Sequence, residues 1–135
     1  MFKIKKEHLS FGLNLCSKAL AQRQQEDVVY RSVRLTTFTS EGKSYLAMMS
    51  NGGYNAVKTA GFPITELTEE MDVLVECQKL LDVVGKSTVD ELKFDKISEE
   101  NIKVTANGEN KLRYSPGELI APLPKYEDSE VIGGM

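Results

Sequence analysis

The chain has 135 residues, of which 41% are hydrophobic and 27% are charged, and its formal net charge is −3. This length and composition are enough for one domain with a substantial core, and nothing in them indicates a second domain. No apolar run approaches the roughly 18 to 20 residues that span a bilayer. Residues 1–7 also lack the apolar segment of a signal peptide, so we expect a soluble, cytoplasmic protein without a membrane partner.

The first half of the chain predicts a strand, a helix and three further strands. The helix covers residues 7–21, because one apolar stripe recurs there at steps of four, three and four, formed by Leu9, Leu13, Cys16 and Leu20. In the strand segments polar and apolar side chains alternate, as expected when one face is buried and the other is wet. The predicted strands cover residues 2–4, 32–38, 44–49 and 54–57.

The second half repeats this order in a shorter form. Leu80, Leu81 and Val84 mark the apolar stripe of a helix over residues 78–84. The predicted strands cover residues 72–75, 91–97, 101–106 and 111–114. In each half the last two strands are joined at an Asn-Gly pair, which is preferred in type I′ turns because both central residues need positive φ. These pairs are Asn51-Gly52 and Asn107-Gly108.

Such a repeat indicates that the domain was built by doubling one unit. We predict an α+β fold in which an internally duplicated β-α-β-β-β unit packs two helices side by side on an antiparallel sheet. Residues 61–70, between the copies, are interpreted as an irregular connector. The predicted domain covers residues 1–124, and residues 125–135 form a linker or the start of a following domain that is missing.

Residue types that carry enzyme chemistry are sparse. His8 is the only histidine, and the nearest thiol, Cys16, lies eight positions along the same helix, about 12 Å away at a rise of about 1.5 Å per residue. The sequence has no Gly-rich phosphate loop, no Ser elbow and no Cys and His set with metal-ligand spacing. We therefore predict no catalysis, no metal and no cofactor, and interpret Cys16 and Cys77 as small buried hydrophobic side chains.

Charge is distributed unevenly along the chain. Residues 1–23 contain five basic side chains and one acidic side chain, a net charge of +4, whereas the remaining residues carry −7. A chain that is acidic overall and basic around its first helix can hold a polyanion at one surface and repel it elsewhere. The other interpretation, a solvated helix face without a ligand, remains open.

Four segments carry a resemblance to a known family: residues 2–9 (FKIKKEHL), Arg23, residues 77–84 (CQKLLDVV) and residues 121–124 (APLP). With the order and spacing of the predicted elements, they resemble the N-terminal domain of the bacterial DNA polymerase III beta subunit, the beta sliding clamp. The resemblance extends from Phe2 to about Val131. The family's protomer is similar to three such domains in series, so this chain resembles either a fragment or a single-domain relative.

The resemblance implies a processivity factor. A clamp ring is similar to six such domains in a circle, which encircle duplex DNA without sequence specificity and tether a replicative polymerase. DNA polymerase, the clamp loader and other clamp domains in the ring are the implied partners. Lys and Arg contacts to phosphates permit sliding. The implied DNA contacts are Arg23, Lys18, Lys79 and Lys86, with Asn14 and Gln78 as polar candidates.

The strand over residues 111–114 is similar to the strand through which the family's subunits meet. Leu112 and Tyr114 are expected on one face of it, either at a subunit interface or in this domain's own core. The alternative function is a clamp-like protein-interaction module that does not encircle DNA. A reading frame that continues past Met135 into two further similar domains would favour the clamp, and a stop codon there would favour the module.

Overall fold

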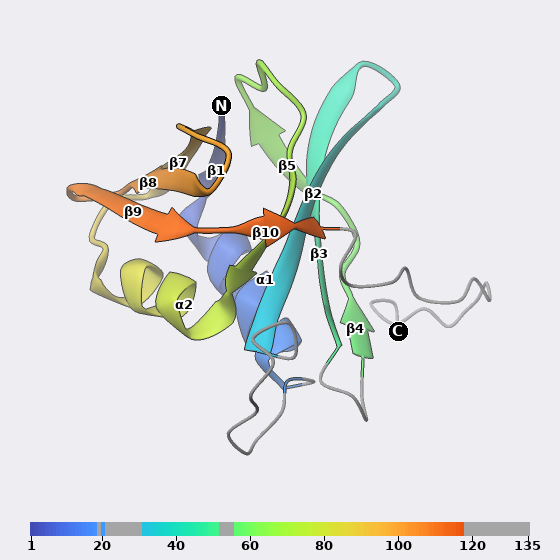
Figure 1. Ribbon diagram of the computed structural model, residues 1–135. Helices are drawn as coiled ribbons and strands as arrows, with labels where there is room; N and C mark the ends of the chain where they lie inside the picture. The colour runs from blue at the N-terminus through green and yellow to red at the C-terminus, as the bar shows by residue number, and fades with distance from the viewer. Residues whose placement is uncertain (19, 21–30, 52–55, 118–135) are drawn as a thin grey trace.

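The computed structural model describes residues 1–18, 20, 31–51 and 56–117, and the structural statements below concern these ranges (Figure 1). Their elements, in chain order, are β1 (Phe2–Lys5), α1 (Lys6–Ser17), β2 (Ser32–Ser40), β3 (Lys43–Asn51), β4 (Ala56–Lys58), β5 (Phe62–Thr65), β6 (Asp72–Glu76), α2 (Cys77–Lys86), β7 (Glu91–Lys96), β8 (Asn101–Thr105), β9 (Glu109–Arg113) and β10 (Ser115–Pro116). Within the described ranges, neither helix combines the length and the hydropathy needed to cross a lipid bilayer.

The strands form one antiparallel sheet, as predicted. Its order is β10-β6-β2-β3-β5-β1-β7-β8-β9, and β4 pairs with β3 beside this path. The two helices lie next to each other and pack on the sheet (Figure 1). The predicted α+β fold is therefore confirmed.

The predicted duplication is also present, and each copy is one strand longer than predicted. The elements β1, α1, β2, β3, β4 and β5 correspond in order to β6, α2, β7, β8, β9 and β10. The interpretation of residues 61–70 as an irregular connector is wrong, because β5 lies in this segment. Its side chains alternate: Ile64 is buried, whereas Pro63 and Thr65 are exposed. Ile64 lies opposite Ile4 of β1 on one side and Ser44 of β3 on the other.

The two copies exchange their first strands. β1 pairs with β7 of the second copy, and β6 pairs with β2 of the first. Where β1 meets β7, Phe2 lies opposite Phe94, and the two rings stack with their centroids 5.0 Å apart. Neither copy therefore completes its part of the sheet without the other.

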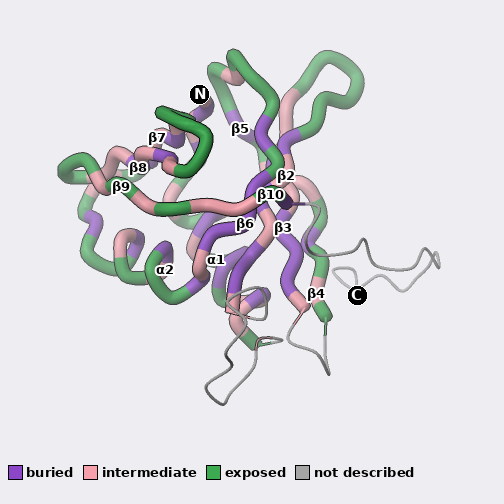
Figure 2. Tube along the Cα trace, viewed as in Figure 1, coloured by how far each residue is buried: buried purple, intermediate pink, exposed green. Residues whose placement is uncertain are grey.

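The core lies between the helices and the sheet (Figure 2). The apolar stripes predicted on the helices face it. Leu9, Leu13 and Cys16 of α1 are buried, as are Leu80 and Val84 of α2. Thus the 3.6-residue period correctly identified the buried side of each helix.

Helix α1 ends at Ser17, before the predicted end at residue 21. The Ser17 hydroxyl donates a hydrogen bond to the carbonyl of Asn14, at 2.8 Å. The N–H groups of Lys18 and Leu20 donate to carbonyls three residues back, those of Leu15 and Ser17. Such bonds satisfy the last carbonyls and close the helix, and the apolar period does not report them.

The Asn-Gly pair at residues 107–108 lies in the β8–β9 hairpin, but not in a type I′ turn. Three residues, 106–108, separate the paired Thr105 and Glu109, and no positive φ occurs among them. The Asn107 carboxamide instead accepts a hydrogen bond from the N–H of Thr88, just after α2, at 3.0 Å. The two-residue turn with positive φ is Glu41-Gly42, with φ of 53° and 80°, between β2 and β3. The other predicted turn includes Gly52, which is outside the described residues.

Candidate nucleic-acid interface

The candidate surface consists of the exposed sides of the two neighbouring helices. On and just after α1, exposed residues recur at steps of four, three and four, on the side opposite the buried stripe; they are Glu7, Phe11, Asn14 and Lys18. The exposed residues of α2 are Gln78, Lys79, Asp82, Gly85 and Lys86. Five of the six predicted DNA contacts are thus exposed on adjacent helices. The sixth, Arg23, lies outside the described residues.

Asn14 and Gln78, the two polar candidates, already make side-chain hydrogen bonds to residues of their own helices. The Asn14 carboxamide donates to the carbonyl of Ser10 at 2.8 Å, and the Gln78 carboxamide donates to Oδ1 of Asp82 at 3.0 Å. Lys79 lies 3.8 Å from Glu76, but its side chain is 64% exposed, and an exposed pair of this kind contributes little to stability. The lysine charges therefore stay close to solvent.

Two lysines of the basic segment over residues 1–23 are bound to other parts of the domain. Lys3 Nζ lies 3.2 Å from Oε2 of Glu66. Lys6 Nζ donates a hydrogen bond to the backbone carbonyl of Ser87, which follows α2. Both contacts join parts of the chain that are far apart in sequence. The basic surface is therefore smaller than the composition of this segment indicated.

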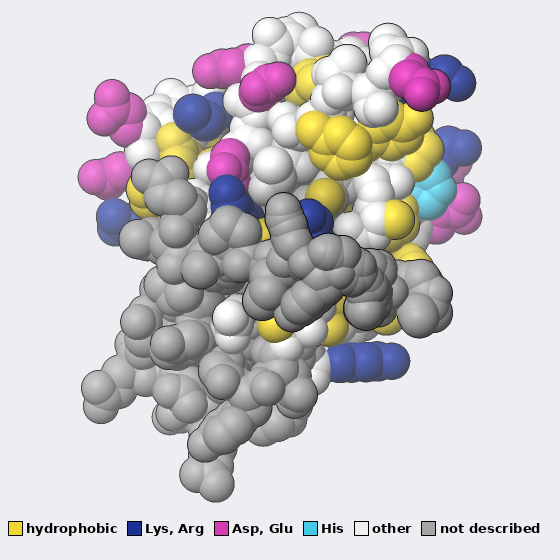
Figure 3. All heavy atoms as spheres, turned by 90° about the vertical axis from the view of Figure 1, so that its right-hand side faces the viewer, with side chains coloured by type: hydrophobic (Ala, Val, Ile, Leu, Met, Phe, Trp, Pro, Cys, Tyr) yellow, Lys and Arg dark blue, Asp and Glu magenta, His cyan; other side chains and the backbone are white. Residues whose placement is uncertain are grey.

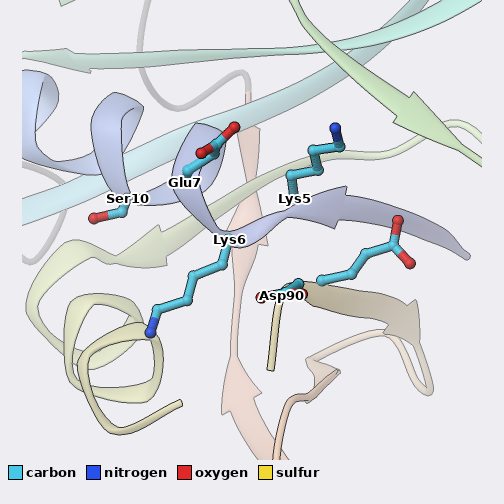
Figure 4. Close-up of a pocket in the computed structure, with 6 residues that line it drawn as sticks. Lys5, Lys6, Glu7, Ser10 and Asp90 are labelled. Carbon is cyan, nitrogen blue, oxygen red and sulfur yellow. The ribbon is translucent and has the colours of Figure 1, made fainter. Parts of the chain in front are cut away.

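A hollow beside this segment is lined by charged side chains of both signs (Figure 4). Its lining residues are Lys5, Lys6, Glu7, Ser10, Asp90 and Glu91. The side chain of Lys6 points away from Lys5 and toward α2 (Figure 4). The backbone N–H of Lys6 donates to the carbonyl of Asp90 at 2.7 Å. With two basic and three acidic side chains, the hollow has no dominant charge that would attract an ion of one sign.

An aromatic group lies along the same helix. His8 stacks on Phe62 of β5, with ring centroids 5.7 Å apart, and Phe11 meets Phe62 edge-on at 6.2 Å. Phe11 is 60% exposed, and Figure 3 shows the histidine with hydrophobic side chains beside it. Phe11 is not among the predicted DNA contacts, although its position off the apolar stripe indicates exposure. Its ring cannot neutralise a phosphate, so it weakens this side of α1 as a DNA contact.

His8 packs on an aromatic ring and the two cysteines are buried, so all three side chains contribute to the packing of the domain. Burial raises the pKa of the Cys16 thiol to about 12 and that of Cys77 to about 11. Both thiols are free and buried, as predicted. A thiol of such high pKa is protonated at neutral pH and is a poor nucleophile. In the part of the chain that the structure describes, no three His, Cys, Asp or Glu side chains are arranged to hold a metal ion.

Leu112 and Tyr114, the predicted interface residues, are partly buried against the domain's own core. The Tyr114 hydroxyl donates to the carbonyl of Ser98 at 2.9 Å, and the Lys96 ammonium lies over its ring, 5.9 Å from the centroid. Leu112 belongs to β9, an end strand of the sheet, whose outer edge has no partner strand within the described ranges. Both residues thus contribute to the domain, and their role at a subunit interface stays a prediction.

No protein-family model and no curated protein sequence matches the chain. Solved structures do. The DNA polymerase beta subunit of Streptococcus pyogenes superposes with a TM-score of 0.79 at 12% identity over 97% of this chain and 34% of that protein. The Bacillus subtilis DNA polymerase sliding clamp gives 0.80 and 12% over 96% of this chain and 34% of that protein. The Pseudomonas aeruginosa sliding clamp bound to griselimycin gives 0.74 and 21% over 96% and 33%.

The fold is therefore that of a sliding-clamp domain. More specifically, the chain is similar in structure to a domain of the bacterial DNA polymerase III beta subunit, which confirms the resemblance read from the sequence at the level of the fold. It spans about a third of the length of the clamps it matches, 34% for the Streptococcus pyogenes subunit.

Proposed function

We propose that this chain is a DNA sliding-clamp domain, which encircles duplex DNA together with other clamp domains and tethers a replicative polymerase. The observation that carries the proposal is its fold, which follows that of bacterial sliding clamps over nearly the whole chain. Such a function needs no catalytic group in this domain. Its partners would be duplex DNA, the polymerase, the clamp loader and further clamp domains in a ring, and it would act in the cytoplasm.

The exposed lysines of the helix pair support contact with phosphates. Lys79 and Lys86 lie on α2, and Lys18 follows the end of α1. Side chains of this kind attract the DNA backbone without reading bases. Arg23, Asn14 and Gln78 remain proposed contacts, although the last two already have partners within their helices.

A second candidate function is a clamp-like protein-interaction module. The exposed ring of Phe11 favours it, as do Glu7 and Asp82, which place negative charge on the same helices. A surface that binds only DNA gains nothing from these three residues. The two candidates differ in whether the helix lysines attract DNA.

A salt titration of binding to a duplex of random sequence tests the proposal. Each neutralised phosphate contributes a slope of about −0.9 to the log-log salt dependence, and three lysines give about −3. Because the contacts are few, we expect a dissociation constant of about 10⁻⁴ M or weaker at physiological salt. The variant Lys79→Glu with Lys86→Glu should bind more weakly, and the magnitude of its log-log salt slope should be smaller by about 2.

The matched control is Lys43→Glu with Lys111→Glu, which makes the same charge change at exposed positions of the sheet. It should resemble the native chain in slope. If the α2 variant and the native chain bind equally, or if binding is tight and survives high salt, the helix pair is not the DNA surface. The interaction module would then be the better account.

A further inference from the structure

The last described strand, β10, is held to the sheet by little hydrogen bonding of its own. It consists of Ser115 and Pro116, which lie opposite Leu74 and Val73 of β6. Proline has no N–H, so it cannot donate a hydrogen bond to its neighbour. Because one of its two residues is proline, this strand needs other contacts to hold it in place.

An ion pair lies directly beside this strand. Arg34 of β2 donates from Nε to Oδ1 of Asp72 and from Nη2 to Oδ2, both at 2.7 Å. Thr36 donates to the same Oδ1 at 3.2 Å. The Arg34 side chain is only 13% exposed. Two parallel hydrogen bonds between a guanidinium and a carboxylate hold both groups in one orientation.

The backbone passes directly against this pair at Gly117. This residue is buried, and a Cβ atom built on it would lie 2.7 Å from Cγ of Asp72 and 2.9 Å from Nε of Arg34. These distances are too short for a carbon atom, and the carboxylate cannot move without breaking its bonds to Arg34. The φ of Gly117 is outside the left-handed region. The residue is therefore required to be glycine for space and not for its backbone conformation.

We propose that Arg34, Asp72 and Gly117 form a latch that fixes β10 on β6 and sets the direction of the backbone at the end of the described chain. The ion pair provides a rigid platform, and only glycine allows the backbone to reach it. In a clamp of several domains the latch would fix the exit of the chain from this domain. That use rests on the proposed function, whereas the latch itself does not.

A double-mutant cycle, measured in the full chain by the amide hydrogen exchange of β6 and of Ser115 in β10, tests the latch. Gly117→Ala should raise the exchange rates there by about tenfold or more, since overpacking of this kind costs about 1–3 kcal/mol and about 1.4 kcal/mol corresponds to tenfold. Asp72→Ala should also raise them, because it removes the platform. In the Asp72→Ala background, Gly117→Ala should add less than about twofold, because the blocking carboxylate is gone and the Arg34 side chain, no longer bound to it, can move away.

Gly108→Ala is the matched control, because a Cβ there meets nothing within 4 Å, and it should leave these rates unchanged. If the effects of Gly117→Ala and Asp72→Ala multiply as independent changes, or if Gly117→Ala has no effect, the latch is excluded. No DNA is present in this experiment, so its failure and the failure of DNA binding are seen separately.

Discussion

At the scale of single residues, Arg34 and Asp72 form an ion pair with two hydrogen bonds of 2.7 Å. The two bonds from the guanidinium lower the pKa of the Asp72 carboxyl below its usual value. Asp72 stands at the start of β6, where this strand meets β2, one of the two places where the copies pair with each other. The protonation state of the Asp72 carboxyl therefore affects the stability of the pairing between β6 and β2.

This linkage predicts a pH dependence. The folded-state pKa of Asp72 is lower than the unfolded value of about 3.9. The stabilisation is therefore fully present above about pH 4 and is lost as the pH falls through the folded pKa. We expect Asp72→Asn to be less stable than the native chain near neutrality, with the difference shrinking in acid, in urea unfolding followed from about pH 7 to about pH 2. Parallel stability curves would contradict this.

The buried cysteines give a second prediction at this scale. Since burial raises the pKa of Cys16 to about 12 and that of Cys77 to about 11, neither should react with a thiol reagent near neutral pH in the native protein. Both should react once urea unfolds the chain. Cys16→Ala should retain the fold and lose about 1 kcal/mol of stability. Rapid labelling of either cysteine without denaturant would show that these thiols are accessible.

At the scale of the elements, the helices are positioned by what packs beneath them. Gly12 lies on the core side of α1, where a Cβ would be 2.8 Å from Sδ of Met48 and 2.9 Å from Cε2 of Phe62. Gly85, near the end of α2, is exposed, and a Cβ there meets nothing within 4 Å. The close approach of α1 to β3 and β5 thus requires glycine, and α2 has no such requirement.

The two glycines make a matched pair of variants. Alanine is intrinsically better than glycine in a helix by about 1 kcal/mol. Gly85→Ala should therefore stabilise the domain by about 0.5–1 kcal/mol, whereas Gly12→Ala should destabilise it by about 1–3 kcal/mol because the core is overpacked. Urea unfolding of both variants measures this difference. Equal gains would mean that α1 can move away from β3 without cost.

At the scale of the whole molecule, the exchange of first strands makes the two copies one structure. β1 is held between β5 of its own copy and β7 of the other, and β6 is held between β10 and β2. The Phe2 and Phe94 rings stack across one of these junctions. Side chains from both copies form a single buried cluster. A boundary between the copies therefore exists in the sequence and not in the folded domain.

We accordingly expect one cooperative unfolding transition. Circular dichroism and tyrosine fluorescence should give coincident urea curves, which is the mark of two-state behaviour. Separate fragments covering residues 1–69 and 70–135 should each lack the native signal, because the first strand of each fragment loses one of its two neighbouring strands, β7 for β1 and β2 for β6. Two resolved transitions, or a fragment that folds alone, would show that the copies are independent units.

Local patterns were enough to predict the parts of this protein that depend on neighbouring residues. The apolar period of α1 identified its buried side, and the repeated order of elements predicted the duplication and the resemblance to clamp domains. The burial of Cys16 followed from its place on the stripe. These features are local because side-chain direction in a helix or strand is set by its period.

Only the tertiary structure decided which distant residues meet. The sequence does not show that β1 pairs with β7, that Lys6 is bound to the carbonyl of Ser87, or that Gly117 lies against Asp72. Such contacts separate the lysines of the basic segment into two groups. Lys3 and Lys6 are bound to other parts of the domain, whereas Lys5 and Lys18 remain exposed. The physical reason is that a contact between segments far apart in the chain depends on how whole elements pack, and no local period records it.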